Sequence, residues 1–173
     1  MQAIRTAVPA DALRLSQLAE STFRETFAAA NTVDDMALHC AASYGEGIQS
    51  AEIAHPMMAT LLAERERQLV GFAQLRWGSA PACVTGASPG EVQRIYVASE
   101  WHGKGIAQSL MHACLEALRQ RGSDVVWLAV WERNPRAIAF YRKIGFVECG
   151  SHTFPVGNDP QRDIVMAREL LPA

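Results

Sequence analysis

The sequence predicts a mixed α/β domain, and three observations indicate this fold class. Apolar residues recur with strand-like and helix-like periods in the order strand, helices, hairpin, and then strand, helix, strand, helix, strand, strand. The run VVWLAVW (residues 125–131) is continuously apolar, as in a strand buried at the centre of a sheet. With 173 residues, 49% of them hydrophobic, the chain can bury a sizeable core, so we expect a single domain over residues 1–173.

The first half of the chain predicts one strand followed by helices. Residues 4–7 form the strand, and a helix follows from Ala10, where apolar residues recur at three- and four-residue spacing. The segment NTVDDMALHCAA (31–42) indicates a second helix with Thr32 as its N-cap. A short third helix is expected within residues 44–56.

A hairpin and a loop follow. In MMATLLAERERQLVGFAQLRW (57–77), two apolar runs flank a charged turn at residues 64–67, which is typical of a β-hairpin. GSAPACVTGASPG (78–90) is rich in Gly, Pro, Ser and Ala and predicts a loop. The alternating pattern of EVQRIYV (91–97) then predicts a strand.

The second half alternates between helices and strands. A helical face runs from Ile106 to Leu118, and Gly122 is placed to end that helix. After the apolar strand 125–131, NPRAIAFYRKIGF predicts a short helix with Asn134 as N-cap and Gly145 past its end. FVECGSHTF (146–154) and QRDIVMAREL (161–170) complete the chain as two strands.

The segment EWHGKGIAQSL (100–110) is a candidate anion site. A strand runs into a turn with Gly103 and Gly105 and then into a helix, whose first N–H groups are unpaired and favour negative charge. Lys104 adds a positive charge. The dinucleotide fingerprint is not complete, because Gln108 occupies the place of its third glycine, and a P-loop would need Ser or Thr after the lysine. The remaining alternatives are a diphosphate such as that of coenzyme A, or a tight turn alone.

The segment VQRIYVASEWHGKGIAQSLM (92–111) resembles the acetyl-CoA-binding motif of the GCN5-related N-acetyltransferase (GNAT) superfamily, Gln/Arg-x-x-Gly-x-Gly/Ala. Gly105 and Ala107 match, whereas His102 replaces the usual Gln or Arg and removes a full positive charge. The second family element, Asn-x-x-Ala-x-x-x-Tyr, begins at Asn134. It is matched by Ala137 and Tyr141.

A closer resemblance, to the bacterial spermine/spermidine N-acetyltransferases, rests on TFRETF (22–27), on the segment 126–154 and on DIVMA (163–167). The family implies a mixed central sheet, flanked by helices and splayed between its fourth and fifth strands, with acetyl-CoA in the gap. It assigns coenzyme contacts to Ile95, Tyr96, Val97, His102, Gly103, Lys104, Gly105, Ile106, Ala107, Asn134 and Ala137. Backbone groups of Ile95 and Val97 would pair with the pantetheine amides.

Two residues are catalytic candidates. By family resemblance, Tyr141 protonates the departing thiolate; the alternative is a core aromatic residue. Glu91 begins the strand before the turn and is placed to act as a base, directly or through water, because a primary ammonium is almost fully protonated near neutral pH. Its alternative is a solvated charge. No cysteine is placed to form an acyl-enzyme, so we expect direct transfer.

The expected acceptor is the primary amine of a small molecule, with a polyamine such as spermidine or spermine implied by the closer resemblance. Phe23 and Phe27 are expected in the acceptor wall, and Glu25 and Asp35, with Asp34, are candidate carboxylates for the substrate. The alternatives are a protein N-terminal or lysine acetyltransferase, and a coenzyme A-binding regulatory module without catalysis.

Composition limits the other functions. A formal net charge of −2 argues against a general nucleic-acid binder. The four cysteines are far apart in the sequence, which favours buried free thiols over a metal site, and no His spacing indicates one. We expect a cytoplasmic protein without membrane association, since no continuous apolar segment resembles a leader or a membrane span. A homodimer is an open alternative.

Overall fold

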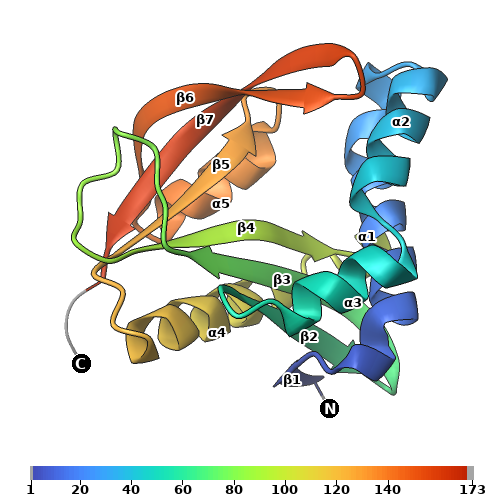
Figure 1. Cartoon of the computed structure of the whole chain (residues 1–173), viewed down its shortest axis with the longest axis horizontal. Helices are drawn as coiled ribbons and strands as arrows, with labels where there is room; N and C mark the ends of the chain where they lie inside the picture. The colour runs from blue at the N-terminus through green and yellow to red at the C-terminus, as the bar shows by residue number, and fades with distance from the viewer. Residues whose placement is uncertain (1, 171–173) are drawn as a thin grey trace.

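The computed structural model describes residues 2–170 and contains one seven-stranded sheet with helices on both faces (Figure 1). Across the sheet the strands lie in the order β1 (Gln2–Thr6), β2 (Met58–Arg65), β3 (Gln68–Trp77), β4 (Pro89–Val97), β5 (Val125–Trp131), β7 (Asp159–Glu169) and β6 (Val147–Val156). The β4–β5 pair is parallel, and the other pairs are antiparallel. The expected mixed α/β fold is confirmed.

Five α-helices cover the sheet: α1 (Ala12–Phe27), α2 (Val33–Ser43), α3 (Glu46–Ala54), α4 (Ile106–Gln120) and α5 (Pro135–Lys143). Helices α1 and α2 pack in one apolar core, and α4 and α5 pack in a second core on the opposite face. Thr32 caps α2 as expected, since its hydroxyl accepts the backbone N–H of Asp35 at 3.1 Å. No helix within residues 2–170 has the length and apolar character that crossing a bilayer requires.

The first helix begins later than its apolar pattern indicates. A 3₁₀ turn, Pro9–Asp11, precedes α1. The carboxylate of Asp11 accepts the backbone N–H of Val8 and two hydrogen bonds from Arg5. This partly buried ion pair holds the end of β1 against the start of α1, and it lowers the pKa of Asp11 to about 2.

The sheet separates between β4 and β5, as the family resemblance implies. Their pairing is limited to Pro89–Val125, Gly90–Val126 and Glu91–Trp127. Immediately beyond, the β3–β4 register shifts: Leu75 pairs with Val92 and Gln74 with Arg94, so Gln93 is an extra residue. Such a bulge increases local twist and bends the strand. It lies where β4 leaves β5, and Figure 1 shows the two strands diverging toward α1 and α2.

The cysteines differ in part from the expectation of separate buried thiols. Cys40 and Cys114 are buried, but Cys149 on β6 is exposed, and its Sγ lies 3.3 Å from the Sγ of Cys83 in the loop before β4. This contact could not be predicted from the sequence, because the two cysteines are 66 positions apart and meet only where the loop folds back over the edge strand β6. Among residues 2–170, no three His, Cys, Asp or Glu side chains are grouped as metal ligands would be.

Candidate active site

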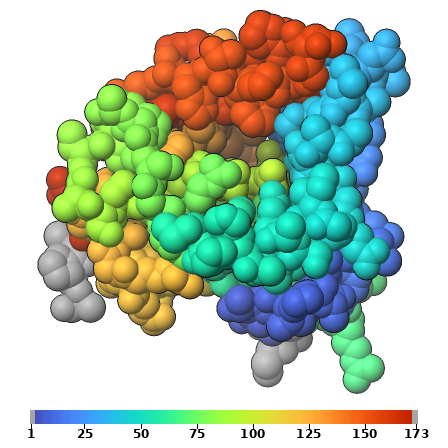
Figure 2. All heavy atoms as spheres, viewed as in Figure 1, coloured from blue at the N-terminus to red at the C-terminus, as the bar shows by residue number. Residues whose placement is uncertain are grey.

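A cavity of about 510 Å³ lies in the gap between β4 and β5 and extends under α1 and the β6–β7 hairpin. Figure 2 shows a hollow in this face, bounded by the β6–β7 hairpin and by α2 and α3. The structure brings most of the expected site residues together in the cavity lining: Phe23, Glu25, Phe27, Ile95, Tyr96, Val97, His102, Ala107, Asn134, Ala137 and Tyr141. Six predicted residues lie outside this lining: Asp35, Glu91, Gly103, Lys104, Gly105 and Ile106.

The glycine turn lies beside the cavity and leaves the start of α4 open. Gly103 and Gly105 have φ angles of 76° and 77°, a left-handed conformation that L side chains rarely adopt. A Cβ at either position would meet no atom within 4 Å, so the space in front of the turn is free. Helix α4 has no side-chain cap, and its first backbone N–H groups, starting at Ile106, therefore form an accessible anion site. Lys104 lies over the Trp101 ring, 4.3 Å from its centroid.

His102 is built into this site through both ring nitrogens. Nε2 donates to the carbonyl of Val97 at 2.8 Å, and Nδ1 accepts from the Arg136 guanidinium at 2.9 Å. Arg136 belongs to α5 and also lines the cavity. It therefore supplies, from another helix, the positive charge that His102 lacks relative to the family motif. Arg136 was not among the predicted site residues, although its position two residues after Asn134, in the first turn of α5, was an available signal.

The edge of β4 that faces the gap is unpaired beyond Glu91. The N–H of Ala98 donates to Val70 of β3 at 3.0 Å. Because the backbone groups of successive residues in a strand point to opposite edges, those of Ile95 and Val97 point away from β3 into the gap. The Val97 carbonyl, which His102 reaches from that side, agrees with this orientation.

Asn134 and Tyr141 are held by α5. Asn134 caps the helix, since its Oδ1 accepts the N–H of Ala137 at 3.1 Å, and Pro135 occupies the first turn as expected. Tyr141 follows about two turns later and is 8% exposed. Phe140 and Phe146 contact its ring edge to face. Burial raises the pKa of Tyr141 well above its ordinary value, so its hydroxyl remains protonated at physiological pH.

Aromatic rings form the wall opposite α5. Phe23 and Phe27 stack with ring centroids 4.3 Å apart, and His39 stacks on the other side of Phe23 at 4.1 Å. Trp131, at the end of β5, lies 5.0 Å from Phe27, and Phe154 of β6 lies 5.6 Å from His39. A wall of this kind suits a small apolar group or a cation placed over ring faces.

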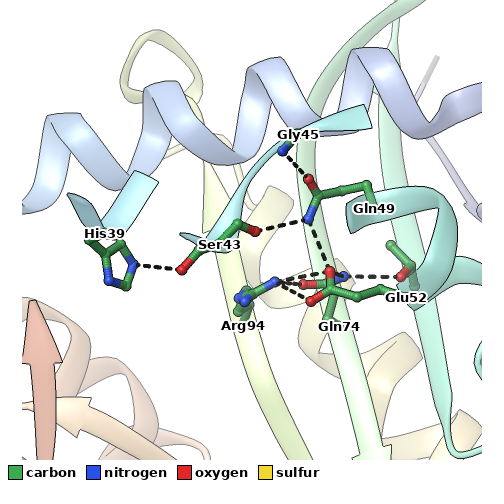
Figure 3. A network of polar contacts seen from close by, with 8 residues as sticks. His39, Ser43, Gly45, Gln49, Glu52, Gln74 and Arg94 are labelled. Atoms are coloured by element: carbon green, nitrogen blue, oxygen red, sulfur yellow. Dashed lines mark hydrogen bonds and ion pairs between the residues drawn. The ribbon is translucent and has the colours of Figure 1, made fainter. Parts of the chain in front are cut away.

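Arg94, one of the arginines that line the cavity, already has hydrogen-bond partners. Figure 3 shows its guanidinium between Glu52 and Gln74. The Arg94 Nη1 lies 3.1 Å from Glu52 Oε2 and 2.6 Å from Gln74 Oε1. Glu52 Oε2 also accepts from Gln49 and Gln74, so the network joins α3 to β3 and β4. Glu52 therefore balances the charge of Arg94.

Three of the carboxylates predicted from the sequence to act as a base or to bind the substrate do not lie together. Glu25 lines the cavity at its exposed rim and accepts the N–H of Ser99 at 3.1 Å. The carboxylate of Asp35 accepts the N–H of Asn158 and the hydroxyl of Thr32, and so fastens α2 to the β6–β7 turn. Glu91 is buried where β4 still pairs with Trp127, and burial raises its pKa. A fourth carboxylate, Asp163 of β7, lines the cavity and was missed.

Comparison with known proteins gives one family. The sequence profile of the acetyltransferase (GNAT) family matches residues 16–146. An uncharacterised N-acetyltransferase of Mycobacterium tuberculosis is 34% identical over 137 residues, which are 77% of this chain and 83% of that protein. An uncharacterised N-acetyltransferase encoded in the pepI 3′ region of Lactobacillus delbrueckii subsp. lactis is 27% identical and covers 89% of each chain.

Solved structures agree on the fold. The PaiA N-acetyltransferase of Thermoplasma acidophilum, crystallised with coenzyme A, superposes with a TM-score of 0.79 at 20% identity and covers 98% of this chain and 99% of that one. The ribosomal-protein-alanine N-acetyltransferase of Brucella melitensis superposes with a TM-score of 0.72 at 26% identity, over 97% and 99% of the two chains.

Proposed function

The chain belongs to the acetyltransferase (GNAT) family, whose co-substrate is acetyl-CoA, and we propose that it transfers the acetyl group directly to the primary amine of a small molecule. One observation carries this proposal. A single cavity is lined by Ala107 in the first turn of α4, by the unpaired edge of β4 and by the hydroxyl-bearing side chain of Tyr141. A coenzyme and an amine can therefore meet inside it without an intermediate carrier on the protein.

The residues present suit coenzyme A. The left-handed turn at Gly103 and Gly105 leaves open space where a Cβ would stand, so a diphosphate can approach the backbone N–H groups there. Arg136 adds the charge for a phosphate oxygen, and the gap edge of β4 offers Ile95 and Val97 to amide groups. The bound thioester supplies the activated acetyl group, and in this proposal Tyr141 protonates the thiolate that leaves.

The acceptor half favours one ammonium group next to an apolar or aromatic body. Phe23, Phe27 and Trp131 supply ring faces, whereas Arg133, which also lines the cavity, disfavours a second ammonium. Spermidine and spermine, the acceptors implied by the sequence resemblance, would depend on Glu25 at the rim. A monoamine with a small apolar group is the acceptor class that this charge distribution supports best.

The test is a thiol-release assay of acetyl-CoA with 2-phenylethylamine, spermidine, spermine, free amino acids, and peptides that present an N-terminal alanine or an internal lysine. We expect the highest kcat/KM with a small amine. A preference of about tenfold or more for a peptide would replace the small-molecule acceptor with a protein. If no amine is acetylated although coenzyme A binds, the chain is a coenzyme-binding module and the proposal is wrong.

A further inference from the structure

Asp163, a residue of the cavity lining, is a buried carboxylate with one unpartnered oxygen. It lies in β7 between Trp131 of β5 and His152 of β6. Its residue is 7% exposed, and Oδ1 has no hydrogen-bond partner within the described part of the chain. Burying an oxygen of this kind is costly unless a donor reaches it. Because Asp163 also lines the cavity, a ligand bound there is a possible source of a donor for its carboxyl group.

A second oxygen supports the same conclusion. Gln93 Oε1 is also buried and unpartnered, and Gln93 lines the cavity from the bulge where β4 leaves β5. The described residues hold a third such oxygen, Gln161 Oε1, but Gln161 lies outside the cavity lining. Two of the three residues with unpartnered oxygens thus line one cavity, which favours an occupant that carries hydrogen-bond donors.

Electrostatic interactions place Asp163 near the reaction centre. Its charge adds to the effect of burial in raising the pKa of Tyr96 to about 12, and Tyr96 in turn adds to the raised pKa of Tyr141. Tyr96 therefore lies within electrostatic reach of both groups, on the strand that borders the gap. Asp163 and Tyr141 both line the cavity in which the acetyl group would be transferred.

We propose that Asp163 binds the ammonium group of the acceptor through its carboxylate and takes a proton from it before transfer, an inference that rests on the proposed function. The neutral amine then attacks the thioester carbonyl carbon, so that the C–N bond forms and the C–S bond breaks. Tyr141 gives its proton to the thiolate and regains one from the amine nitrogen. Asp163 releases its proton to solvent. The balance is one acetylamine, one free thiol and one proton from one ammonium and one thioester.

Two other side chains are less well placed for this role. Glu91 is buried behind the cavity wall, at the last paired position of β4 and β5. His39 lines the cavity, but its Nε2 lies 3.4 Å from the Ser43 hydroxyl and the ring is also hydrogen-bonded to the backbone of Pro155. Of these three residues, only Asp163 both lines the cavity and has a buried oxygen without a hydrogen-bond partner.

The charged surroundings of Asp163 set the pH dependence. Burial, and secondarily the nearby Glu132, raise the pKa of Asp163 to about 6. The other groups that face it are His152 of β6, whose Nε2 lies 3.9 Å from Oδ2, and Tyr96 of β4; Arg162, its neighbour on β7, pairs with Glu132 at 2.9 Å. Asp163 accepts a proton only when ionised. The acceptor kcat/KM of the wild type should therefore rise as pH increases through about 6.

The test compares Asp163→Asn with wild type, using 2-phenylethylamine and spermidine as probes. We expect kcat/KM for the probe to fall by about a hundredfold, and the acidic limb near pH 6 to disappear, with the dissociation constant for coenzyme A unchanged by calorimetry. Glu132→Gln is the matched variant that leaves Asp163 in place. It should retain activity and move the acidic limb to lower pH, because a nearby like charge is removed.

The pH dependence of thermal stability distinguishes the proposed role of Asp163 from a purely structural role. A carboxyl whose pKa is raised by folding makes the folded state less stable as pH rises from about 4 to 6, and the loss persists above 6. Asp163→Asn should therefore melt at or above the wild-type temperature at pH 7, and the difference should close near pH 4. Full activity of Asp163→Asn, or an unmoved limb in Glu132→Gln, would overturn the assignment. Failure of every amine to bind or react in the wild type would instead overturn the proposed function, and this inference with it.

Discussion

Tyr141 is a phenol whose surroundings keep its proton in place. Because burial raises its pKa, the hydroxyl can donate over the whole physiological range. Tyr141→Phe retains the ring and its contacts with Phe140 and Phe146 but removes the donor. We expect kcat to fall by about a hundredfold with KM for acetyl-CoA nearly unchanged, since the lost interaction forms mainly in the transition state.

The measurement is steady-state kinetics at several solvent viscosities, which show whether chemistry limits the rate. The melting temperature of the variant should stay close to that of the wild type, because the packing is preserved. An unchanged kcat under rate-limiting chemistry would return Tyr141 to a purely structural place in the core.

Arg136 restores a charge that the α4 motif lacks. Its guanidinium donates to His102 from the first turn of α5 and lines the coenzyme side of the cavity. Arg136→Gln should raise the dissociation constant for coenzyme A by about tenfold, or about 1.4 kcal/mol, and should weaken its dependence on salt. The matched control is Arg142→Gln, on the same helix but outside the cavity lining and paired with Glu148. Equal effects of the two variants in calorimetry would contradict the assignment.

At the scale of elements, the start of α4 is the part of the fold that the coenzyme requires. Gly105, at its N-cap, and Gly122, past its C-terminus, have φ angles of 77° and 83°, and a Cβ at either would meet no atom within 4 Å. Alanine at the two positions should therefore cost similar stability through backbone strain, about 1–2 kcal/mol.

Coenzyme binding separates the two glycine variants. Only Gly105→Ala puts its methyl group where the diphosphate is proposed to lie, and we expect its dissociation constant for coenzyme A to rise about tenfold while that of Gly122→Ala remains unchanged. Melting curves check the shared strain, and calorimetry checks the difference. If both variants bind coenzyme A like wild type, the diphosphate does not lie on this turn.

The whole molecule favours a mechanism in which both substrates are bound together. The cavity extends from Ala107, in the first turn of α4, to the aromatic wall, and none of Cys40, Cys83, Cys114 and Cys149 belongs to its lining. Double-reciprocal plots with acetyl-CoA and amine varied together should therefore intersect. Incubation with acetyl-CoA alone should leave no acetyl group on the protein by mass spectrometry. Parallel lines with an acetylated residue would indicate a two-step route instead.

Local features of the fold were predictable because nearby residues encode them. The caps at Thr32 and Asn134, the left-handed turns at Gly105 and Gly122, and the apolar run of β5 each depend on side chains within a few positions. The splay between β4 and β5 and the gathering of the coenzyme residues followed from the family resemblance of the motifs, and the structure contains both the splay and a cavity lined by most of those residues.

The contacts that decide the chemistry were not predictable in the same way, because the strand order sets them. Asp163 reaches the cavity since β7 lies between β5 and β6, which the alternating pattern of a strand cannot indicate. Arg136 and His102 are 34 positions apart, and Arg94 and Glu52 are 42 apart. Asp35, which suited a substrate carboxylate by its position in the sequence, is used to fasten a turn. The sequence by itself determined the elements and the coenzyme motifs, because these depend on short-range backbone requirements. Tertiary structure alone decided which charges are balanced and which carboxylate remains free for an amine, because both depend on long-range packing.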